Sequence, residues 1–155
     1  KIVMPQSQST SHLKKIPVTA IKRESGFYKQ VKEAASRSNY KLNLTRIENW
    51  VGAGIPDLLI CDQLGAFHFV ELKYTTTNKV DLRPSQVAWL TRHGKGSCWV
   101  LVKKQPMPSD VAEIYLFQGS DAVDLKMDGL DKVKPEFKCK QPFQWDKIFS
   151  LICPV

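Results

Sequence analysis

Two apolar segments separated by a short polar turn constrain this chain more than any other feature of its sequence. The segments are DLLIC, residues 57–61, and AFHFVELKY, residues 66–74, and the turn between them is DQLG. Apolar runs of this length, joined by a short link with glycine, predict a β-hairpin. Because side chains alternate between the faces of a strand, Glu71 and Lys73 share one face. The hairpin also brings Asp57, at the start of its first strand, towards these two residues.

Two carboxylates and an ammonium group beside a glycine-rich loop suit phosphodiester hydrolysis. Mg²⁺ prefers oxygen ligands and takes one or two protein carboxylates together with waters and substrate phosphate. Asp57 and Glu71 supply such carboxylates, and the main-chain carbonyl of Leu72 is a further candidate ligand. Such an ion polarises a phosphoryl oxygen and lowers the pKa of an attacking water. Lys73 is a candidate to orient that water or to stabilise the developing charge.

We therefore expect a Mg²⁺ site at the hairpin, with Mn²⁺ as a substitute. A simpler interpretation exists for each part of the pattern. An acid and a lysine at a strand end often form a surface ion pair, and Pro-Asp is common in turns. Residue types alone leave both interpretations open.

The remaining pattern predicts an α/β domain with a basic N-terminal arm. Residues 1–23 are polar and basic and are expected to be extended or mobile, which leaves residues 24–155 as the single domain. Residues 120–142 are predicted to be irregular. Helices are predicted at 24–38, 84–93 and 145–152, and further strands at 41–47, 98–104 and 112–119.

Glu24 stands out within the first predicted helix. At about 100° per residue, Phe27, Val31 and Ala35 fall on one apolar stripe, and Glu24 falls inside it. An acid on the buried side of a helix costs free energy unless it is paired or binds a metal. Glu24 is therefore a candidate metal ligand or a holder of metal-bound water. The alternative is an acid that the helix macrodipole favours at the N-terminus.

The charge of the chain is unevenly distributed. The 155 residues include 23 Lys and Arg against 15 Asp and Glu, a formal net charge of +8. Residues 1–41 hold nine of the basic residues and two Glu, a net +7. A surplus of this kind suggests a polyanionic partner such as nucleic acid, and a solubilising surface explains it equally well.

Several residues are candidates for contact with nucleic acid. Gly52 and Gly54 leave space for a close backbone, and Trp50 is a candidate to stack on an unpaired base, although a partly buried anchor is the other interpretation. Phosphate contacts are predicted at Lys14, Lys15, Lys22, Arg23, Arg46, Lys79, Arg83 and Arg92.

Cysteine spacing and hydropathy argue against a zinc site and against a membrane-spanning helix. The four cysteines show no CxxC motif and no histidine at metal-ligand spacing, which predicts free thiols and no zinc. The chain has no apolar run long enough for a transmembrane helix and no signal-peptide core. We therefore expect an intracellular, cytoplasmic protein without membrane association, in the host cytoplasm if a phage encodes it.

The segments RIENWVGAGIPDLLI, FHFVELK and LRPSQVAWL resemble the PD-(D/E)xK nuclease superfamily. They look most like its branch of VRR-NUC domains and archaeal-type Holliday junction resolvases, which includes small phage-encoded members. The resemblance covers about residues 24–104 and implies a restriction-endonuclease-like core, with a central mixed β-sheet flanked by helices. It implies that Asp57, Glu71 and Lys73 are catalytic and that Gln86 lies beside the active site. Glu24 matches the acid of the family's first helix.

This resemblance implies a metal-dependent endonuclease that hydrolyses DNA and selects structure, such as a Holliday junction, a flap or another branched or partly single-stranded substrate. Two alternatives stay open: a non-catalytic nucleic-acid-binding module on the same fold, and an RNA endonuclease of viral type. Resolvases of this branch are typically homodimers, since two cuts need two related sites. The basic arm and the extension after residue 105 depart from simple resolvases.

Overall fold

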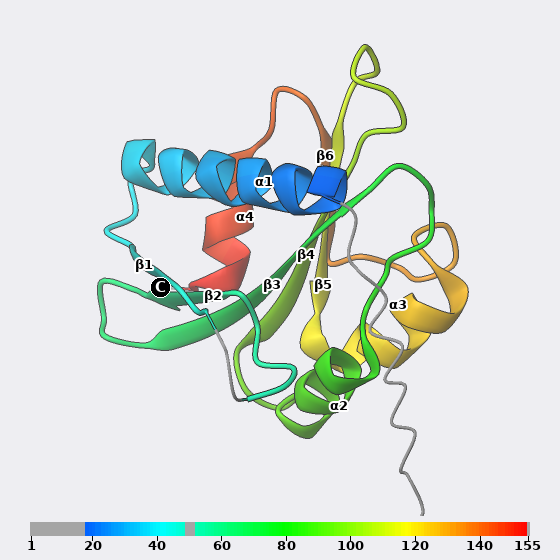
Figure 1. Cartoon of the computed structure of the whole chain (residues 1–155). Coiled ribbons are helices and arrows are strands. Elements are labelled where there is room, and N and C mark those ends of the chain that lie inside the picture. Colours follow the sequence, from blue (N-terminus) through cyan, green and yellow to red (C-terminus); the bar gives the residue numbers. More distant parts are fainter. Residues whose placement is uncertain (1–17, 49–51, 155) are drawn as a thin grey trace, which may run out of the picture.

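Six strands lie side by side in chain order, and helices cover both faces of the sheet they form (Figure 1). The computed structural model describes residues 18–48 and 52–154. The elements are α1 (Val18–Arg37), β1 (Asn43–Arg46), β2 (Leu58–Cys61), β3 (Phe67–Thr75), α2 (Pro84–Arg92), β4 (Cys98–Lys104), β5 (Glu113–Gln118), the 3₁₀ helix η1 (Gly119–Asp121), α3 (Ala122–Asp128), β6 (Phe137–Lys140) and α4 (Trp145–Ile152).

The sheet is mixed because one pair of neighbouring strands is joined by a helix instead of a turn. β3 and β4 run parallel, and α2 makes the crossover between them, as a parallel connection requires. All other neighbours in the sheet are antiparallel. The structure confirms the predicted α/β class with a central mixed sheet flanked by helices.

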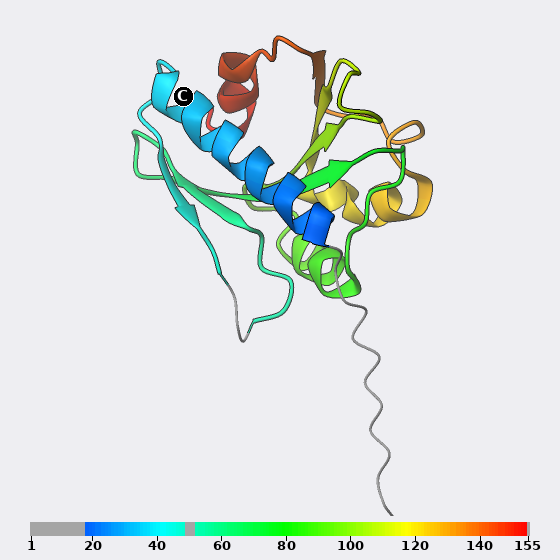
Figure 2. The same cartoon turned by 45° about the horizontal axis from the view of Figure 1, so that its top comes forward.

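Each face of the sheet carries its own hydrophobic core. On one face, Phe27 of α1 and Phe149 of α4 pack with Leu58 and Ile60 of β2. On the other face, residues of α2 and α3 pack with β4 and β5, around Val100. Figure 2 shows α1 and α4 together on one side of the sheet. The candidate catalytic residues come from β3 and its surroundings, in the middle of this layered arrangement.

Helix α1 follows the predicted stripe but starts earlier than predicted. Phe27, Val31 and Ala35 are buried, whereas Glu33 and Arg37 form an exposed ion pair at 2.6 Å. The helix begins at Val18, so residues 18–23, expected to belong to the arm, are helical. Residues 18–23 make fewer than two helical turns and mix three apolar with three polar or basic residues, so apolar periodicity did not reveal them. Residues 1–17 lie outside the described part of the chain.

The prediction of irregular structure for residues 120–142 is wrong. This segment contains α3 and β6, and β6 pairs antiparallel with β5. Both elements are short and bury few residues: Ala122 and Leu125 in α3, and Cys139 in β6. Such short elements do not repeat an apolar pattern often enough to be recognised, and packing on the sheet stabilises them.

The predicted hairpin is present, and its turn is fixed by a buried polar network. Asp62 Oδ1 accepts hydrogen bonds from the N–H groups of Leu64 (2.9 Å) and Ala66 (3.0 Å). Asp62 Oδ2 accepts from Nε2 of His68 (2.7 Å), and the other ring nitrogen of His68 is bonded to Oγ of Ser97. His68 therefore joins the hairpin turn to the start of β4, and it faces away from Glu71 as predicted.

Two further findings concern the whole described chain. Cys61, Cys98, Cys139 and Cys153 are all free thiols, as predicted. No helix within residues 18–48 and 52–154 has the length and hydropathy to cross a membrane.

The Asp62 network predicts an acid-sensitive contribution to stability. The hydrogen bond from His68 is the main cause that lowers the pKa of Asp62 below its usual 3.8. The stabilisation is therefore present above that value and is lost as the pH falls through the lower native pKa. In urea unfolding between about pH 5 and pH 3, we expect the wild type to lose stability more steeply than Asp62→Asn. Parallel pH profiles would contradict this role, and Asp128→Asn, at an exposed acid, is the control.

Candidate active site

The register of the hairpin places Asp57 beside Glu71. Leu58 of β2 pairs with Val70 of β3, and one further step in the same antiparallel register sets Asp57 opposite Glu71. The Leu72 N–H, on the edge of β3 that faces Asp57, donates to Asp57 Oδ2 at 3.3 Å. The main-chain N–H and C=O of a strand residue point to the same side. The Leu72 carbonyl therefore faces the same space as the Asp57 carboxylate, as its prediction as a ligand requires.

Gln86 holds the Glu71 carboxylate from the side of α2. Its Nε2 donates to Glu71 Oε1 at 2.7 Å, and its own Oε1 accepts the N–H of Arg83 at 2.9 Å. Gln86 is 3% exposed, so both polar ends of its amide are satisfied inside the protein. The residue predicted to lie beside the site thus links the N-terminus of α2 to β3 and fixes the orientation of Glu71.

Gly54 is required by its close packing against the start of α2. It is buried, has a φ of +90°, and a Cβ at this position would lie 2.0 Å from the main-chain oxygen of Ser85. The loop before β2 is therefore pressed against the first turn of α2. Ser85 fills the space that a side chain at position 54 would take, and the contact of Gly54 with a nucleic-acid backbone stays a prediction. Gly52, the other predicted glycine, is half-buried.

Glu71 is a buried carboxylate with one oxygen left without a partner. The residue is 1% exposed, and among the described residues its Oε2 has no hydrogen-bond donor. Burial raises the pKa of Glu71 well above its usual range, the nearby Asp57 raises it further, and Lys73 opposes both. Two ionised carboxylates cannot hydrogen-bond each other, because neither has a proton to donate. The pair therefore needs a shared proton or a cation.

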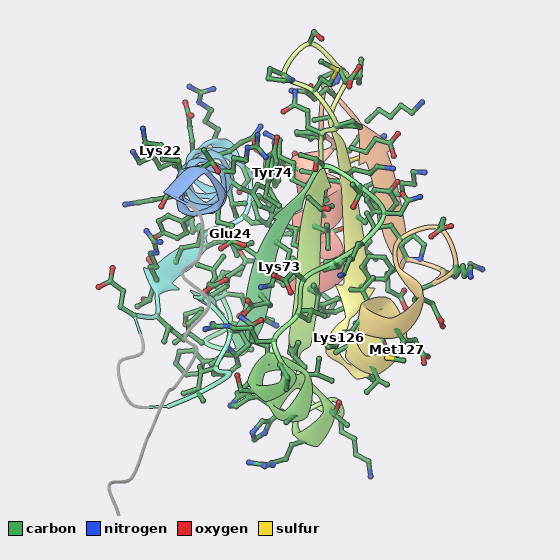
Figure 3. The ribbon with its side chains drawn as sticks, turned by 45° about the vertical axis from the view of Figure 1, so that its right-hand side comes forward. Lys22, Glu24, Lys73, Tyr74, Lys126 and Met127 are labelled. Atoms are coloured by element: carbon green, nitrogen blue, oxygen red, sulfur yellow. The ribbon has the colours of Figure 1, made fainter. Side chains whose placement is uncertain are left out.

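Lys73 and Glu24 border the same space. Nζ of Lys73 lies 3.7 Å from Glu71 Oε1, and the lysine is 8% exposed. Figure 3 shows Glu24 on the side of α1 next to β3, with Lys73 on that strand. Burial raises the pKa of Glu24, Lys73 lowers it and Asp57 raises it. The structure thus brings Glu24 into the electrostatic reach of Lys73 and Asp57.

The acids fit a Mg²⁺ ion held by two protein carboxylates. Mg²⁺ keeps several waters and needs only one or two carboxylates from the protein, and the unpaired Oε2 of Glu71 is an oxygen of the required type. No cluster of three or more Asp, Glu, His or Cys side chains is placed to hold a metal within the described residues. The structure therefore does not join Glu24 to Asp57 and Glu71 as a third direct ligand, and a role through metal-bound water fits its position better.

The predicted phosphate contacts are scattered, and some lie near the site. Arg83 lies close enough to Glu24 to lower its pKa. The guanidinium of Arg23 lies 5.6 Å from the ring centre of Tyr74, and that of Arg46 lies 5.0 Å from Tyr28. The others are exposed on α1, in the loop before α2 and at the end of α2: Lys22, Lys79 and Arg92. Lys14, Lys15 and Trp50 lie outside the described residues.

Asp81 is a neighbour of the site that the sequence did not indicate. It raises the pKa of Glu24, so its carboxylate lies close to that of Glu24. Asp81 is exposed in the loop between β3 and α2. Its position depends on how this loop crosses the end of the sheet, and no local pattern in the sequence predicts that path.

Comparisons with known proteins give one structural likeness. No protein-family model matches the sequence, and no curated protein does. Among solved structures, the chain is similar to Hjc of Archaeoglobus fulgidus, a Holliday junction resolvase from an archaeal hyperthermophile. The identity is 13% and the TM-score 0.41, over 81% of this chain and 98% of that chain. A likeness of this size leaves the chemistry to be argued from the side chains themselves.

A matched pair of variants can separate two effects of Gly54 on stability, that of its packing against Ser85 and that of its backbone conformation. Gly54 and Gly65 have φ of +90° and +81°, but a Cβ on Gly65 would meet no atom within 4 Å. We expect Gly65→Ala to lower the unfolding free energy by roughly 1–2 kcal/mol, the cost of a left-handed alanine. Gly54→Ala should cost clearly more, because its Cβ displaces Ser85. Equal losses in urea unfolding would show that the contact with Ser85 contributes nothing.

Removing the charge of Glu71 should stabilise the protein. In Glu71→Gln the buried charge beside Asp57 is gone, and the new amide has a donor for Asp57. We expect the unfolding free energy at neutral pH to rise by about 1–3 kcal/mol, the usual cost of an unsatisfied buried polar group. Because the native pKa of Glu71 lies above its usual 4.5, the gain should grow as the pH rises through that native pKa and vanish in acid. A Glu71→Gln protein that is less stable at all pH values would contradict this account.

Proposed function

We propose that this protein is a metal-dependent endonuclease that hydrolyses DNA phosphodiester bonds. The single observation that carries the proposal is the buried Glu71 beside the half-buried Asp57: one Glu71 oxygen has no partner among the described residues, and a lysine lies 3.7 Å from the other. A buried carboxylate placed beside a second carboxylate costs stability, and proteins keep such arrangements where function requires them. The resemblance of the sequence to PD-(D/E)xK nucleases supports the same chemistry.

In this proposal each side chain has a distinct task. Asp57 and Glu71, with the carbonyl of Leu72, hold Mg²⁺ or Mn²⁺, which supplies Lewis-acid polarisation of the phosphate and a more acidic water. Lys73 stabilises the negative charge that develops on the phosphate oxygens, or orients the attacking water. Gln86 keeps Glu71 in place through its hydrogen bond to Oε1. Glu24 accepts a hydrogen bond from water at the edge of the site.

We further propose that the substrate is branched or partly single-stranded DNA and that two copies of the chain act together. Both proposals rest on the resemblance to the Holliday junction resolvase branch. Exposed Arg23, Arg46 and Arg83 lie around the candidate site or on the elements that form it and offer contacts for phosphates. Contacts of this kind position a nucleic acid without reading its sequence, in keeping with selection for structure.

The test is cleavage of end-labelled four-way junctions, flaps, single strands and plain duplex in the presence of Mg²⁺ or Mn²⁺. We expect the wild type to cut at least one branched substrate faster than plain duplex. Asp57→Asn and Lys73→Ala should each lower the rate by at least about 100-fold, the usual effect of removing a group that stabilises the transition state. Glu33→Gln, at an exposed acid of α1 paired with Arg37, should cut as the wild type does.

Other results of the same assay would overturn the proposal. If no substrate is cut although the protein binds DNA, the chain is a non-catalytic binding module. If an RNA hairpin is cut and the DNA hairpin of the same sequence is not, the protein is an RNA endonuclease. If Asp57→Asn cuts as well as the wild type, the carboxylate pair is not the active site.

A further inference from the structure

A hollow lined by lysines lies at the ends of β4, β5 and β6. Its volume is about 500 Å³. Four lysines line it, Lys104, Lys132, Lys134 and Lys138, against two acids, Glu113 and Asp131. We call this surface the lysine hollow. Most of its residues belong to the C-terminal part of the chain, beyond the segment that resembles nucleases, while Asn78 and Lys104 come from that segment; the proposed chemistry uses none of them.

Glu113, one of the two acids, already has partners within the protein. Oε2 of Glu113 accepts the hydroxyl of Tyr115 at 2.6 Å and lies 3.4 Å from Nζ of Lys138. These contacts, the Tyr115 hydrogen bond foremost, lower the pKa of Glu113. Lys138 also lies over the ring of Tyr115, 4.8 Å from its centre. Glu113 and Lys138 therefore neutralise each other at the floor of the hollow.

The other three lysines keep their charge available. Nζ of Lys104 donates to the neutral side-chain oxygen of Asn78 at 2.6 Å. Among the described residues, none of the ion pairs involves Lys104, Lys132 or Lys134. Three ammonium groups thus face Asp131 alone, and the hollow has a positive surplus that an anion would balance.

The backbone around the lysine hollow is held in place by close contacts. The N–H of Leu130 donates to the carbonyl of Asn78 at 2.8 Å. Gly129 has a φ of +82°, and a Cβ there would lie 2.7 Å from the same carbonyl oxygen. The loop at residues 75–83 is braced as well, since Oγ1 of Thr75 donates to the carbonyl of Lys79 at 2.7 Å. The lysine side chains therefore extend from a fixed frame.

The fold separates charges that the sequence mixes. Residues 111–155 contain six lysines and seven acids, a net charge of −1. Three of those lysines meet Lys104 in the lysine hollow. Elsewhere, burial raises the pKa of Asp121, and the nearby acids Asp124 and Glu136 raise it further. A surface that served only solubility would have no need for this separation.

The loop at residues 75–83 connects the lysine hollow to the candidate active site. Asn78 lines the hollow, and Lys79 lines a smaller adjoining hollow of about 200 Å³ that also includes Asn78. Asp81 and Arg83, further along the same loop, act on Glu24. Figure 1 shows this loop descending from the end of β3 to α2. An extended polyanion at the active site can therefore reach the hollow across one loop.

We propose that the lysine hollow binds the phosphate backbone of a second segment of the DNA that is cut at the candidate active site. This inference rests on the proposed function. Lysines are common contacts for DNA phosphates, whereas they are depleted from the centres of protein–protein interfaces. A nucleic acid therefore fits the hollow better than an acidic protein does. The extension after residue 105 then serves to hold a second part of the substrate.

The test measures binding of a four-way junction over a range of salt concentrations, without divalent metal so that no cleavage occurs. In the double variant Lys132→Gln/Lys134→Gln, we expect affinity to fall about tenfold and the slope of log Kd against log salt to decrease by about 1.8, at about 0.9 per lost phosphate contact. The matched control is Lys95→Gln/Lys147→Gln, at two exposed lysines that should leave the slope unchanged.

Cleavage separates this inference from the proposed function. With Mg²⁺ and saturating DNA, the double variant should cut at the wild-type rate, because it leaves the carboxylate pair intact. If the wild type cuts nothing, the proposed function fails, while the loss of salt slope still supports DNA in the hollow. An unchanged slope, or an equal loss in the control variant, would overturn the inference. Tripolyphosphate that binds as tightly as the junction, and is lost equally in the double variant, would assign the hollow to a small phosphorylated ligand instead.

Discussion

The antiparallel register of β2 and β3 is the constraint on which the candidate site depends. It sets Asp57 opposite Glu71 and lets the Asp57 carboxylate accept the Leu72 N–H on the edge of β3 that β2 leaves unpaired beyond Val70. A shift by one residue would move Asp57 to the other face of the sheet. The turn network of Asp62 and His68 and the packing of Gly54 on Ser85 secure this register from both ends of β2.

The arrangement holds a carboxylate in a place that is unfavourable for it. Glu71 is buried next to Asp57, and among the described residues Gln86 and Lys73 compensate for its charge. Its second oxygen has no donor among the described residues. Proteins tend to keep such destabilising arrangements at sites where ligand binding or catalysis requires them. A divalent cation between the carboxylates of Asp57 and Glu71 would offset their mutual repulsion and at the same time give Oε2 of Glu71 a partner.

Local pattern in the sequence was sufficient to predict most of the elements and the approach of Asp57 to Glu71, whereas the place of Gln86 beside them was implied by the resemblance to a nuclease family. The hairpin, the apolar stripe of α1, the strand β4 and the helix α4 follow from periodicity, and the register follows from the hairpin. Asp57, Glu71 and Gln86 meet as expected. The functions of these residues stay predictions.

The features that the sequence did not predict depend on contacts between distant segments. The sequence indicated Gly54 as a residue that leaves space for a close backbone, but not that this neighbour is Ser85 of α2. α3 and β6 are too short to show a period, and they form because the sheet offers them a surface. The lysine hollow combines Lys104 with lysines of residues 132–138, a grouping that net charge along the chain conceals. The contact of the N-terminal basic residues with nucleic acid stays a prediction. Residues 1–17, which carry part of this charge, lie outside the described part of the chain.

The most direct test of the account is the binding of Mn²⁺ measured by electron paramagnetic resonance. The account predicts one Mn²⁺ bound per wild-type chain, loss of that binding in Asp57→Asn, and wild-type binding in Asp131→Asn, which changes an acid of the lysine hollow. Wild-type binding of Mn²⁺ by Asp57→Asn would contradict the central claim that Asp57 and Glu71 together hold the catalytic metal.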